Sequence, residues 1–356
     1  MPPLTTADLR ARIAAFPRVR LAALPTPIDD CPRLAAAIGV PRLLVKRDDL
    51  TGLAFGGNKT RHLEFILGRA VADGATRIVT AASVQSNQCR QTAAAAAKLG
   101  LPAHLVLRGT ASEPPEANLL LDRLFGAEIE ILPPDHSLAM LNARVNAVME
   151  AYRARGERPY FVDLINETSS DNILAALAYA EAIVETVDQV GGLANAPAAI
   201  YLCCGSEGSA TMAGILVGCR VLGLTTRVIG IPAAKVPDQI RQGTLSIAHR
   251  ALKELGVTAE ITLDDIHIEH AYVGEGYAMP TAGGLEAMRL AARLEGLALE
   301  PTYTAKALAA LIAHSHEGRF RAGETVWFLH SGGTPLLFQR DVARLIVDDA
   351  LAAERT

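Results

Sequence analysis

The stretch KRDDLTGLAFGGNKTRHLE, residues 46–64, places one lysine, Lys59, directly behind a Gly-Gly-Asn turn and at the start of an expected helix. Gly56 and Gly57 allow positive φ or a close approach to a flat ligand, and Asn58 is a favoured N-cap residue. A helix N-terminus disfavours extra positive charge, so a partly buried lysine there should lose its proton easily. Because Schiff-base formation requires a neutral amine, the stretch predicts a lysine for covalent chemistry rather than a solvated surface lysine.

Apolar residues of the 356-residue chain recur alternately with the spacing of strands and of helices. This alternation predicts mostly parallel sheets built from right-handed crossovers, so the fold class is α/β. The length suffices for two lobes, each with its own core. Strands are expected at residues 43–46, 77–81, 103–107, 128–132, 160–162, 199–203, 227–231 and 325–329, and helices at 60–71, 87–99, 117–125, 138–153, 172–190, 211–222, 238–255, 284–294 and 305–314.

Composition and charge exclude several classes of protein. Half of the residues are hydrophobic, yet no apolar run reaches the roughly 18 to 20 residues of a membrane helix. A net charge of −4 with dispersed Lys and Arg argues against nucleic acid as a partner. Asp8, Arg10 and Arg12 precede any long apolar stretch, so no secretory signal or targeting peptide is expected. Five cysteines, an odd number, indicate a reducing cytoplasm rather than a disulfide framework.

The cysteines and histidines predict neither a redox site nor a metal site. Cys203 and Cys204 are adjacent in an apolar run and do not match C-x-x-C spacing, so core packing is expected. Cys89 lies one turn into an expected helix and should be a buried small apolar residue rather than a reactive thiol. His267 and His270 lack a third ligand at a familiar spacing, so no metal is expected.

Two loops that follow expected strands could hold a negatively charged ligand. Gln85-Ser86-Asn87 opens a helix, so its side chains and free N–H groups should lie at the carboxyl end of a parallel sheet. Ser86 could alternatively be only an N-cap. The run CGSEGSAT, residues 204–211, offers unpaired N–H groups to a phosphate, although it matches neither the Walker spacing nor the dinucleotide fingerprint.

Two of the seven tyrosines lie in Gly- or Pro-flanked segments, where a packing role is less automatic: Tyr277 in YVGEGYAMPT and Tyr303 in EPTYTAK. A phenol near a substrate can transfer a proton or bind a carboxylate, while structural packing is the alternative role. Ser331, in HSGGT, ends an expected strand with a hydroxyl group.

The runs KRDD, GGNKTR and LE, followed by Gln85-Ser86-Asn87, resemble the pyridoxal-phosphate enzymes grouped around D-cysteine desulfhydrase and 1-aminocyclopropane-1-carboxylate deaminase, with L-cysteate sulfo-lyase as a close relative. The resemblance extends from Leu24 to His330. It implies the two-lobed tryptophan synthase beta-like fold of fold type II. Residues 53–164 would form a small domain inserted in a large cofactor-binding domain made of residues 1–52 and 165–356, with the cofactor in the cleft between them.

The same resemblance assigns roles to residues. Lys59 would carry pyridoxal 5′-phosphate, Ser86 would hold the substrate carboxylate, and Asn87 would donate to the phenolic oxygen of the cofactor. Ser331 matches a hydrogen-bonding position near the pyridine nitrogen, which a hydroxyl leaves largely unprotonated. The implied residues are, as catalytic, Lys59, Ser86, Tyr277 and Tyr303; as cofactor-binding, Lys59, Asn58, Asn87, Gly205, Ser206, Gly208, Ser209, Ala210, Thr211, Thr304 and Ser331; as substrate-binding, Gln85, Ser86, Asn87 and Gln88.

The chain departs from the family pattern at four places. Glu207 puts an acid beside the expected phosphate, and its side chain should point away. Ala210 stands where relatives usually have Gly or Ser. Residues 164–171, LINETSSD, replace a glycine-rich turn that borders the cleft, which leaves the identity of the substrate open. Thr304 follows the matched tyrosine where the cyclopropane-opening deaminases have a glutamate.

The leading interpretation is a cytoplasmic lyase, a homodimer by resemblance, that converts D-cysteine to pyruvate, sulfide and ammonia, with Lys59 taking the α-proton. Elimination of sulfite from L-cysteate, opening of the cyclopropane ring and elimination from another β-substituted amino acid are alternatives. A nicotinamide oxidoreductase is disfavoured by the missing dinucleotide fingerprint. Lys59, Tyr277 and Tyr303 argue against a catalytically silent binding protein.

Overall fold

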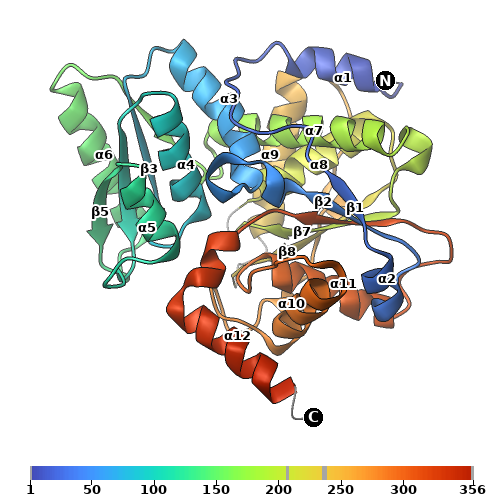
Figure 1. Ribbon diagram of the computed structural model, residues 1–356. Coiled ribbons are helices and arrows are strands. Elements are labelled where there is room, and N and C mark those ends of the chain that lie inside the picture. Colours follow the sequence, from blue (N-terminus) through green and yellow to red (C-terminus); the bar gives the residue numbers. More distant parts are fainter. Residues whose placement is uncertain (1, 206–207, 235–238, 354–356) are drawn as a thin grey trace.

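Two mostly parallel sheets, each covered by helices on both faces, form this protein in a computed structural model that describes residues 2–205, 208–234 and 239–353 (Figure 1). The larger sheet has the order β1-β2-β10-β7-β8-β9 and the smaller β5-β4-β3-β6. The strands are β1 Ile28–Asp30, β2 Leu43–Arg47, β3 Arg77–Ser83, β4 Ala103–Arg108, β5 Glu128–Leu132, β6 Pro159–Val162, β7 Ala199–Cys204, β8 Arg227–Pro232, β9 His267–Ile268 and β10 Val326–His330.

Helices connect most of these strands. They are α1 Thr6–Ile13, α2 Pro32–Ile38, α3 Asn58–Ala72, α4 Asn87–Lys98, α5 Ala117–Leu124, α6 Leu138–Arg153, α7 Asp171–Gln189, α8 Ala210–Val221, α9 Gln239–Glu254, α10 Ala282–Glu295, α11 Thr304–His316 and α12 Arg340–Ala353. The helix α12 projects from the body of the molecule at the lower edge of Figure 1. Short 3₁₀ turns, η1 Asp48–Leu50 and η6 Thr334–Phe338 among them, complete the connections.

The larger sheet buries both of its faces, which explains the continuous apolar run of β10. Trp327 and Leu329 pack toward α7, α8 and α9, whereas Val326 and Phe328 pack toward α2, α10 and α11. Successive side chains of a strand point to opposite faces, so a strand covered on both sides needs no polar position. All its strand pairs are parallel except that of β1 with β2.

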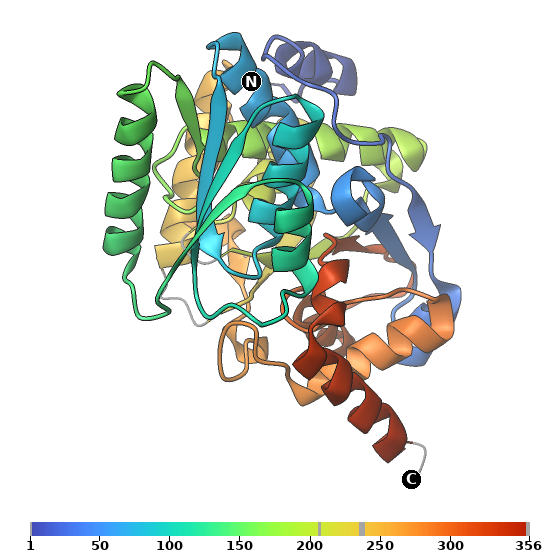
Figure 2. The ribbon, with the colours of Figure 1, turned by 60° about the vertical axis from the view of Figure 1, so that its left-hand side comes forward.

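The smaller sheet is covered in the same way (Figure 2). Val79 and Val106 pack with α6 on one face, and Leu105 and Leu107 pack with α4 and α5 on the other. Cys89 lies within the second of these clusters and is fully buried, as expected from its place on the helix.

The expected α/β class with mostly parallel strands is confirmed, and the expected helices and strands lie within a few residues of the observed ones. Short peripheral elements such as β1 and β9 were not expected, because two or three residues carry too little periodicity. Every strand of the smaller sheet falls within residues 53–164 and every strand of the larger sheet outside them. The domain boundaries themselves stay a prediction.

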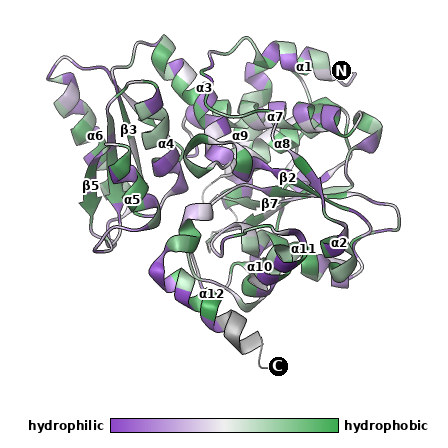
Figure 3. Ribbon diagram, viewed as in Figure 1, coloured by the Kyte–Doolittle hydropathy of each residue, from purple (hydrophilic) through white to green (hydrophobic). Residues whose placement is uncertain are grey.

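In Figure 3 the central strand β7 is coloured as hydrophobic, whereas the projecting helix α12 alternates between hydrophilic and hydrophobic residues along its length. Among the described helices, none combines the length and the apolar character that a membrane crossing demands.

A buried ionic network joins β2, α3 and α7. Asp48 is fully buried and accepts two hydrogen bonds from the Arg61 guanidinium, both 2.9 Å, and one from the Tyr179 hydroxyl at 2.6 Å. Glu185 accepts from Arg61 at 2.8 Å and from the Lys46 amine at 2.6 Å. Two carboxylates and two cations therefore compensate one another inside the protein, so removal of one partner leaves a buried charge.

We expect Asp48→Ala to lower the free energy of unfolding by about 3–5 kcal/mol, because Arg61 would keep a buried charge without its main partner. Urea unfolding followed by circular dichroism measures the change. The exposed pair of Arg69 and Asp73 supplies the control, since Asp73→Ala should change stability by less than about 1 kcal/mol. Equal effects of the two substitutions would contradict the central place of Asp48.

Candidate active site

A cavity of about 450 Å³ lies at the carboxyl ends of the strands, between the two sheets. Its walls come from the ends of β3, β4 and β7 and from the turns that follow β8 and β10. We call this cavity the cleft. Thirteen of the residues expected at the site line it: Asn58, Lys59, Ser86, Asn87, Gln88, Gly205, Gly208, Ser209, Ala210, Thr211, Tyr277, Tyr303 and Ser331.

Lys59 lies in the first turn of α3 and lines the cleft. Burial lowers the pKa of its amine to about 8, and among the described residues no carboxylate pairs with it. The only other group that acts on this pKa is the Cys203 thiol, whose own pKa burial raises well above its ordinary value. The neutral amine is therefore accessible near physiological pH, as the sequence predicted.

Two pairs of glycines hold the lysine turn against the turn after β10. Gly57 has φ +124°, and a side chain there would meet the Ser331 carbonyl oxygen and the Gln91 amide. A side chain on Gly332 would lie 2.6 Å from the Gly57 Cα atom. The Asn58 N–H donates to the Ser331 carbonyl at 2.9 Å. These glycines thus permit a close approach between the backbones of the two turns.

Asn58 does not act as an N-cap, which corrects the interpretation of the lysine turn. Helix α3 begins at Asn58 itself, and Gly57 precedes it without a side-chain cap. The Asn58 amide instead donates to the Thr211 hydroxyl at 3.2 Å, and His62 Nε2 lies 3.1 Å from the same oxygen. The first turns of α3 and α8 are therefore tied together, a contact between distant parts of the chain that local propensity cannot show.

The first turn of α4 forms one wall of the cleft. Ser86 is its N-cap, accepting from the N–H groups of Gln88 and Cys89 at 3.2 and 3.3 Å, and it also lines the cleft. Both roles considered for Ser86 are therefore compatible. The Gln88 side chain is turned toward β3, where its amide donates to the Thr80 hydroxyl at 2.9 Å.

Gln85 is not among the residues that line the cleft, so its expected role in substrate binding finds no support in the pocket and stays a prediction. Its side-chain oxygen accepts from the Asn118 N–H at 3.0 Å, and its amide donates to the Glu116 carbonyl at 3.2 Å. The side chain points away because Gln85 precedes the helix and faces α5. The Asn118 amide also donates to Asn87 Oδ1 at 2.9 Å, a neighbour that sequence reasoning missed.

The loop between β7 and α8 forms the opposite wall. Ser209 caps α8 by accepting from the Met212 N–H at 3.2 Å, and its own N–H donates to Thr244 at 3.1 Å. Gly208 packs so close to α9 that a side chain would touch Gly243. The first N–H groups of a helix have no partner within it and carry partial positive charge. Ser206 and Glu207 lie outside the described residues.

Tyr277 and Tyr303 meet inside the cleft, as the family pattern suggested for both positions. Their hydroxyl oxygens are 2.5 Å apart, and the Tyr277 hydroxyl lies 3.4 Å from Ser83 Oγ. Burial raises the pKa of Tyr303 well above its ordinary value, so the phenol stays protonated. Lys306, fully buried, holds the Tyr277 segment by donating to the Gly276 carbonyl at 2.9 Å.

Thr304 is not among the residues that line the cleft, so its expected role in cofactor binding finds no support in the pocket and stays a prediction. Its hydroxyl lies 3.1 Å from Glu300 Oε1, and its N–H donates to the same oxygen at 2.8 Å. Glu300 also accepts from the N–H groups of Thr302 and Tyr303. Burial raises the pKa of Glu300 to about 7. Thr304 thus belongs to the structure that starts α11, where its side chain is turned inward.

Cys203 and Cys204 pack in the core, as the sequence predicted, and also line the cleft: Cys204 is a buried core residue, and Cys203 packs against the apolar cluster that includes α10 and α11. They are the last residues of β7, and the carboxyl ends of the strands open into the cleft. Cys203 is half-buried and Cys204 is buried. Their position at the end of a parallel strand is the sequence feature that could have predicted a place at the cleft.

Arg108 and residues of the segment 164–171 enclose the outer part of the cleft. Arg108 ends β4 in register with Ser83, so both side chains lie on the same face of the sheet. Its guanidinium donates to the His136 carbonyl at 2.8 Å, and among the described residues it forms no ion pair. The segment 164–171, which differs from the family pattern, contributes Leu164, Ile165 and Glu167 to the lining of the cleft.

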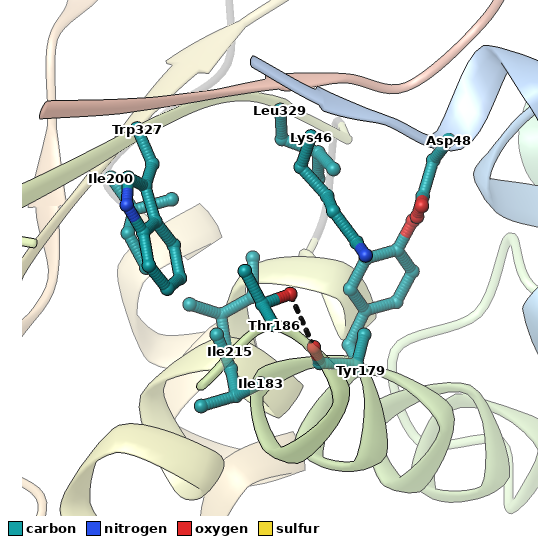
Figure 4. Close-up of a pocket in the computed structure, with 10 residues that line it drawn as sticks. Lys46, Asp48, Tyr179, Ile183, Thr186, Ile200, Ile215, Trp327 and Leu329 are labelled. Atoms are coloured by element: carbon teal, nitrogen blue, oxygen red, sulfur yellow. Dashed lines mark hydrogen bonds between the residues drawn. The ribbon is translucent and has the colours of Figure 1, made fainter. Parts of the chain in front are cut away.

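A second cavity lies within the core beside the ionic network (Figure 4). Its volume of about 20 Å³ suits about one water molecule and no organic ligand. Lys46, Asp48 and Tyr179 line one side, while Ile200 and Trp327 lie among the apolar residues of the other. This cavity is therefore part of the structural core, and the cleft is the candidate active site.

The fold and the cleft together define a class: α/β enzymes with a lysine amine in a cleft between two mostly parallel sheets. The family profile described as "Pyridoxal-phosphate dependent enzyme" matches residues 19–332. The chain belongs to this family of pyridoxal-phosphate-dependent enzymes, and the expected cofactor and enzyme class are confirmed.

Two solved structures are similar to the chain. One, described as an ACC deaminase homologue, shares 30% sequence identity with a TM-score of 0.85, covering 96% of this chain and 98% of that chain. The other is the apo form of Escherichia coli diaminopropionate ammonia lyase, with 15% identity and a TM-score of 0.66, covering 98% of this chain and 93% of that chain. Because its sequence identity is only 15%, this second structure supports the fold alone. The expected two-lobed fold type of the family is confirmed.

Proposed function

We propose that the protein is a lyase that removes the β-substituent and the amino group of a small amino acid, with D-cysteine as the leading substrate. The observation that carries the proposal is the half-buried Lys59 side chain, whose amine has its pKa lowered to about 8, in a cleft that also holds a protonated tyrosine pair. When bound, pyridoxal phosphate supplies an electron sink that weakens the bonds of the substrate α-carbon.

The residues of the cleft fit this cofactor. The amine of Lys59 is suited to hold the aldehyde carbon. The loop of Gly205, Gly208 and Ser209 at the positive end of α8 suits a phosphate, because its small side chains leave room for one beside the first turn of the helix. The amide of Asn87 suits the ring oxygen and Ser331 the ring nitrogen.

Substrate binding is best supported at the first turn of α4. Ser86, Asn87 and Gln88 line the cleft at the positive end of the helix, which favours a carboxylate. Lys59 approaches from α3 on the side of the glycine turns. A neutral amine that borders this carboxylate site is suited to take the α-proton.

The tyrosine pair suits the return of a proton to the leaving group or to the product. Tyr303 has its hydroxyl oxygen 2.5 Å from that of Tyr277, so one phenol can donate while it accepts from the other. Opening of a cyclopropane ring remains an alternative, suggested by the name of the 30% identical structure. Thr304 gives it no support, since this side chain lies away from the cleft.

We expect purified wild-type protein with pyridoxal phosphate to release pyruvate, sulfide and ammonia from D-cysteine. Lys59→Ala should reduce this rate at least about 1,000-fold, because no other amine lines the described cleft for proton transfer. Pyruvate release coupled to a dehydrogenase measures the rate. Lys98→Ala, a change at the far end of α4, is the control. Undiminished pyruvate release by Lys59→Ala would refute the proposal.

A second candidate substrate is L-cysteate, whose leaving group is a sulfonate. Arg108 favours it, because this guanidinium lines the cleft without an ion-pair partner among the described residues. A guanidinium binds an oxyanion through charge-assisted, often bidentate hydrogen bonds. The neighbouring Glu167 would oppose an anion, so the balance between the two side chains decides the preference.

We expect Arg108→Gln to raise the KM for L-cysteate by about 10- to 100-fold, the loss of a charge-assisted contact, and to change the KM for D-cysteine by less than about threefold. Steady-state kinetics with both amino acids and with 1-aminocyclopropane-1-carboxylate measure the effect. Arg144→Gln, which removes an arginine paired with Glu130 outside the cleft, is the control. Equal KM changes for both substrates would contradict a role of Arg108 in recognising the leaving group.

We also infer a homodimer in the cytoplasm, as the resemblance implies. Exposed apolar side chains on α5 and η6 support an interface there, since Leu124 is 73% and Phe338 68% exposed. We expect sedimentation equilibrium of the wild type to give twice the mass of the chain. The double variant Leu124→Asp with Phe338→Asp should give the mass of one chain. Met140→Asp, at an exposed site on α6, is the control and should keep twice the mass. A single-chain mass for the wild type at micromolar concentration would contradict the homodimer.

A further inference from the structure

We infer that Asn118 is a positioning residue that orients the side-chain amide of Asn87, so that the nitrogen of this amide faces the cleft. The inference rests on the proposed function in one respect, the placement of the cofactor ring oxygen beside Asn87. Asn118 itself is fully buried on α5 and does not line the cleft.

Three hydrogen bonds join Asn118 to the turn that starts α4. Its amide nitrogen donates to Asn87 Oδ1 at 2.9 Å and to the Gln85 carbonyl at 2.8 Å. Its main-chain N–H donates to the Gln85 side-chain oxygen at 3.0 Å. Both the backbone of the turn and the amide of Asn87 are thus held from α5.

The orientation of the Asn87 amide follows from the chemistry of this group. Its oxygen only accepts and its nitrogen only donates, and the two lie on opposite sides of a planar group. The Asn87 oxygen is turned toward Asn118, with Arg90 Nη2 at 3.4 Å as a second donor. The nitrogen is therefore the atom left for the cleft. A negatively charged ring oxygen is stabilised by this donor and would be repelled by the amide oxygen.

Two unfavourable features accompany this arrangement. Asn118 Oδ1 is buried and, among the described residues, has no hydrogen-bond partner. Ala117, directly before it, has φ +49°, a conformation that non-glycine residues rarely adopt. Both features cost free energy, so the surrounding structure must hold Asn118 in place. Features of this kind cluster where a side chain is held for function.

The test replaces the donor of Asn118 by an acceptor in a side chain of the same shape. In Asn118→Asp, an oxygen faces Asn87 Oδ1, so the Asn87 amide should turn over and present its oxygen to the cleft. We expect the dissociation constant for pyridoxal phosphate to rise by about 10- to 100-fold, the loss of a hydrogen bond to a charged group. The pH midpoint of the visible absorbance change of the bound cofactor should rise, because the ring oxygen anion loses its donor.

Three further proteins separate positioning from a structural effect. Thr92→Val removes a buried hydroxyl of α4 that has no partner among the described residues, and it should leave the affinity and the absorbance unchanged. Asn118→Ala, which removes the donor without adding charge, should show a smaller change in the same direction and serves if the aspartate variant fails to fold. In an Asn87→Ala background, Asn118→Asp should have no further effect.

An equal loss of affinity from Asn118→Asp with and without the Asn87 side chain would overturn the inference. An unchanged pH midpoint in a folded Asn118→Asp protein would overturn it as well. The titrations use pyridoxal phosphate alone, so a wrong choice of substrate leaves this test intact, while substrate kinetics test the proposed function separately.

Discussion

Asp48 fixes the position of the lysine turn from both sides. Its buried carboxylate binds Arg61, two residues after Lys59, and its carbonyl oxygen accepts from the Gly57 N–H, two residues before it. Lys59 is therefore held between two anchor points on the same residue. A buried carboxylate tolerates little displacement of its cation, because separation leaves both charges unsolvated. The start of α3 and the direction of the reactive amine depend on this constraint.

The cleft is then assembled around the held lysine by contacts between distant segments. The glycines after β10 bring the turn of Ser331 against Gly57, and Asn58 reaches the first turn of α8. The small sheet contributes the first turn of α4, whose amide groups are tied to α5. Three helix N-termini of positive partial charge thus converge on one cavity, which explains why an anionic ligand suits the cleft.

Much of the site could be predicted because it lies in motifs that end strands or begin helices. Lys59, Ser86 and the loop before α8 follow from such positions, which parallel sheets bring to one edge. The side-chain partners of Gln85, Thr304 and Asn58 could not be predicted, because packing rather than local sequence selects them. The place of Cys203 at the cleft was missed for a related reason, since a strand end can pack in the core and still face a cleft.

The sequence by itself determined the α/β class, the mostly parallel strands and the turn that brings Lys59 to the start of a helix, because periodicity and glycine pairs are local properties. Only the tertiary structure decided which way the polar side chains beside that turn point. A hydrogen-bonding side chain buried on folding takes whichever partner the packing brings within about 3 Å. The pairing of Asn118 with Asn87 and the inward turn of Thr304 were decided by packing.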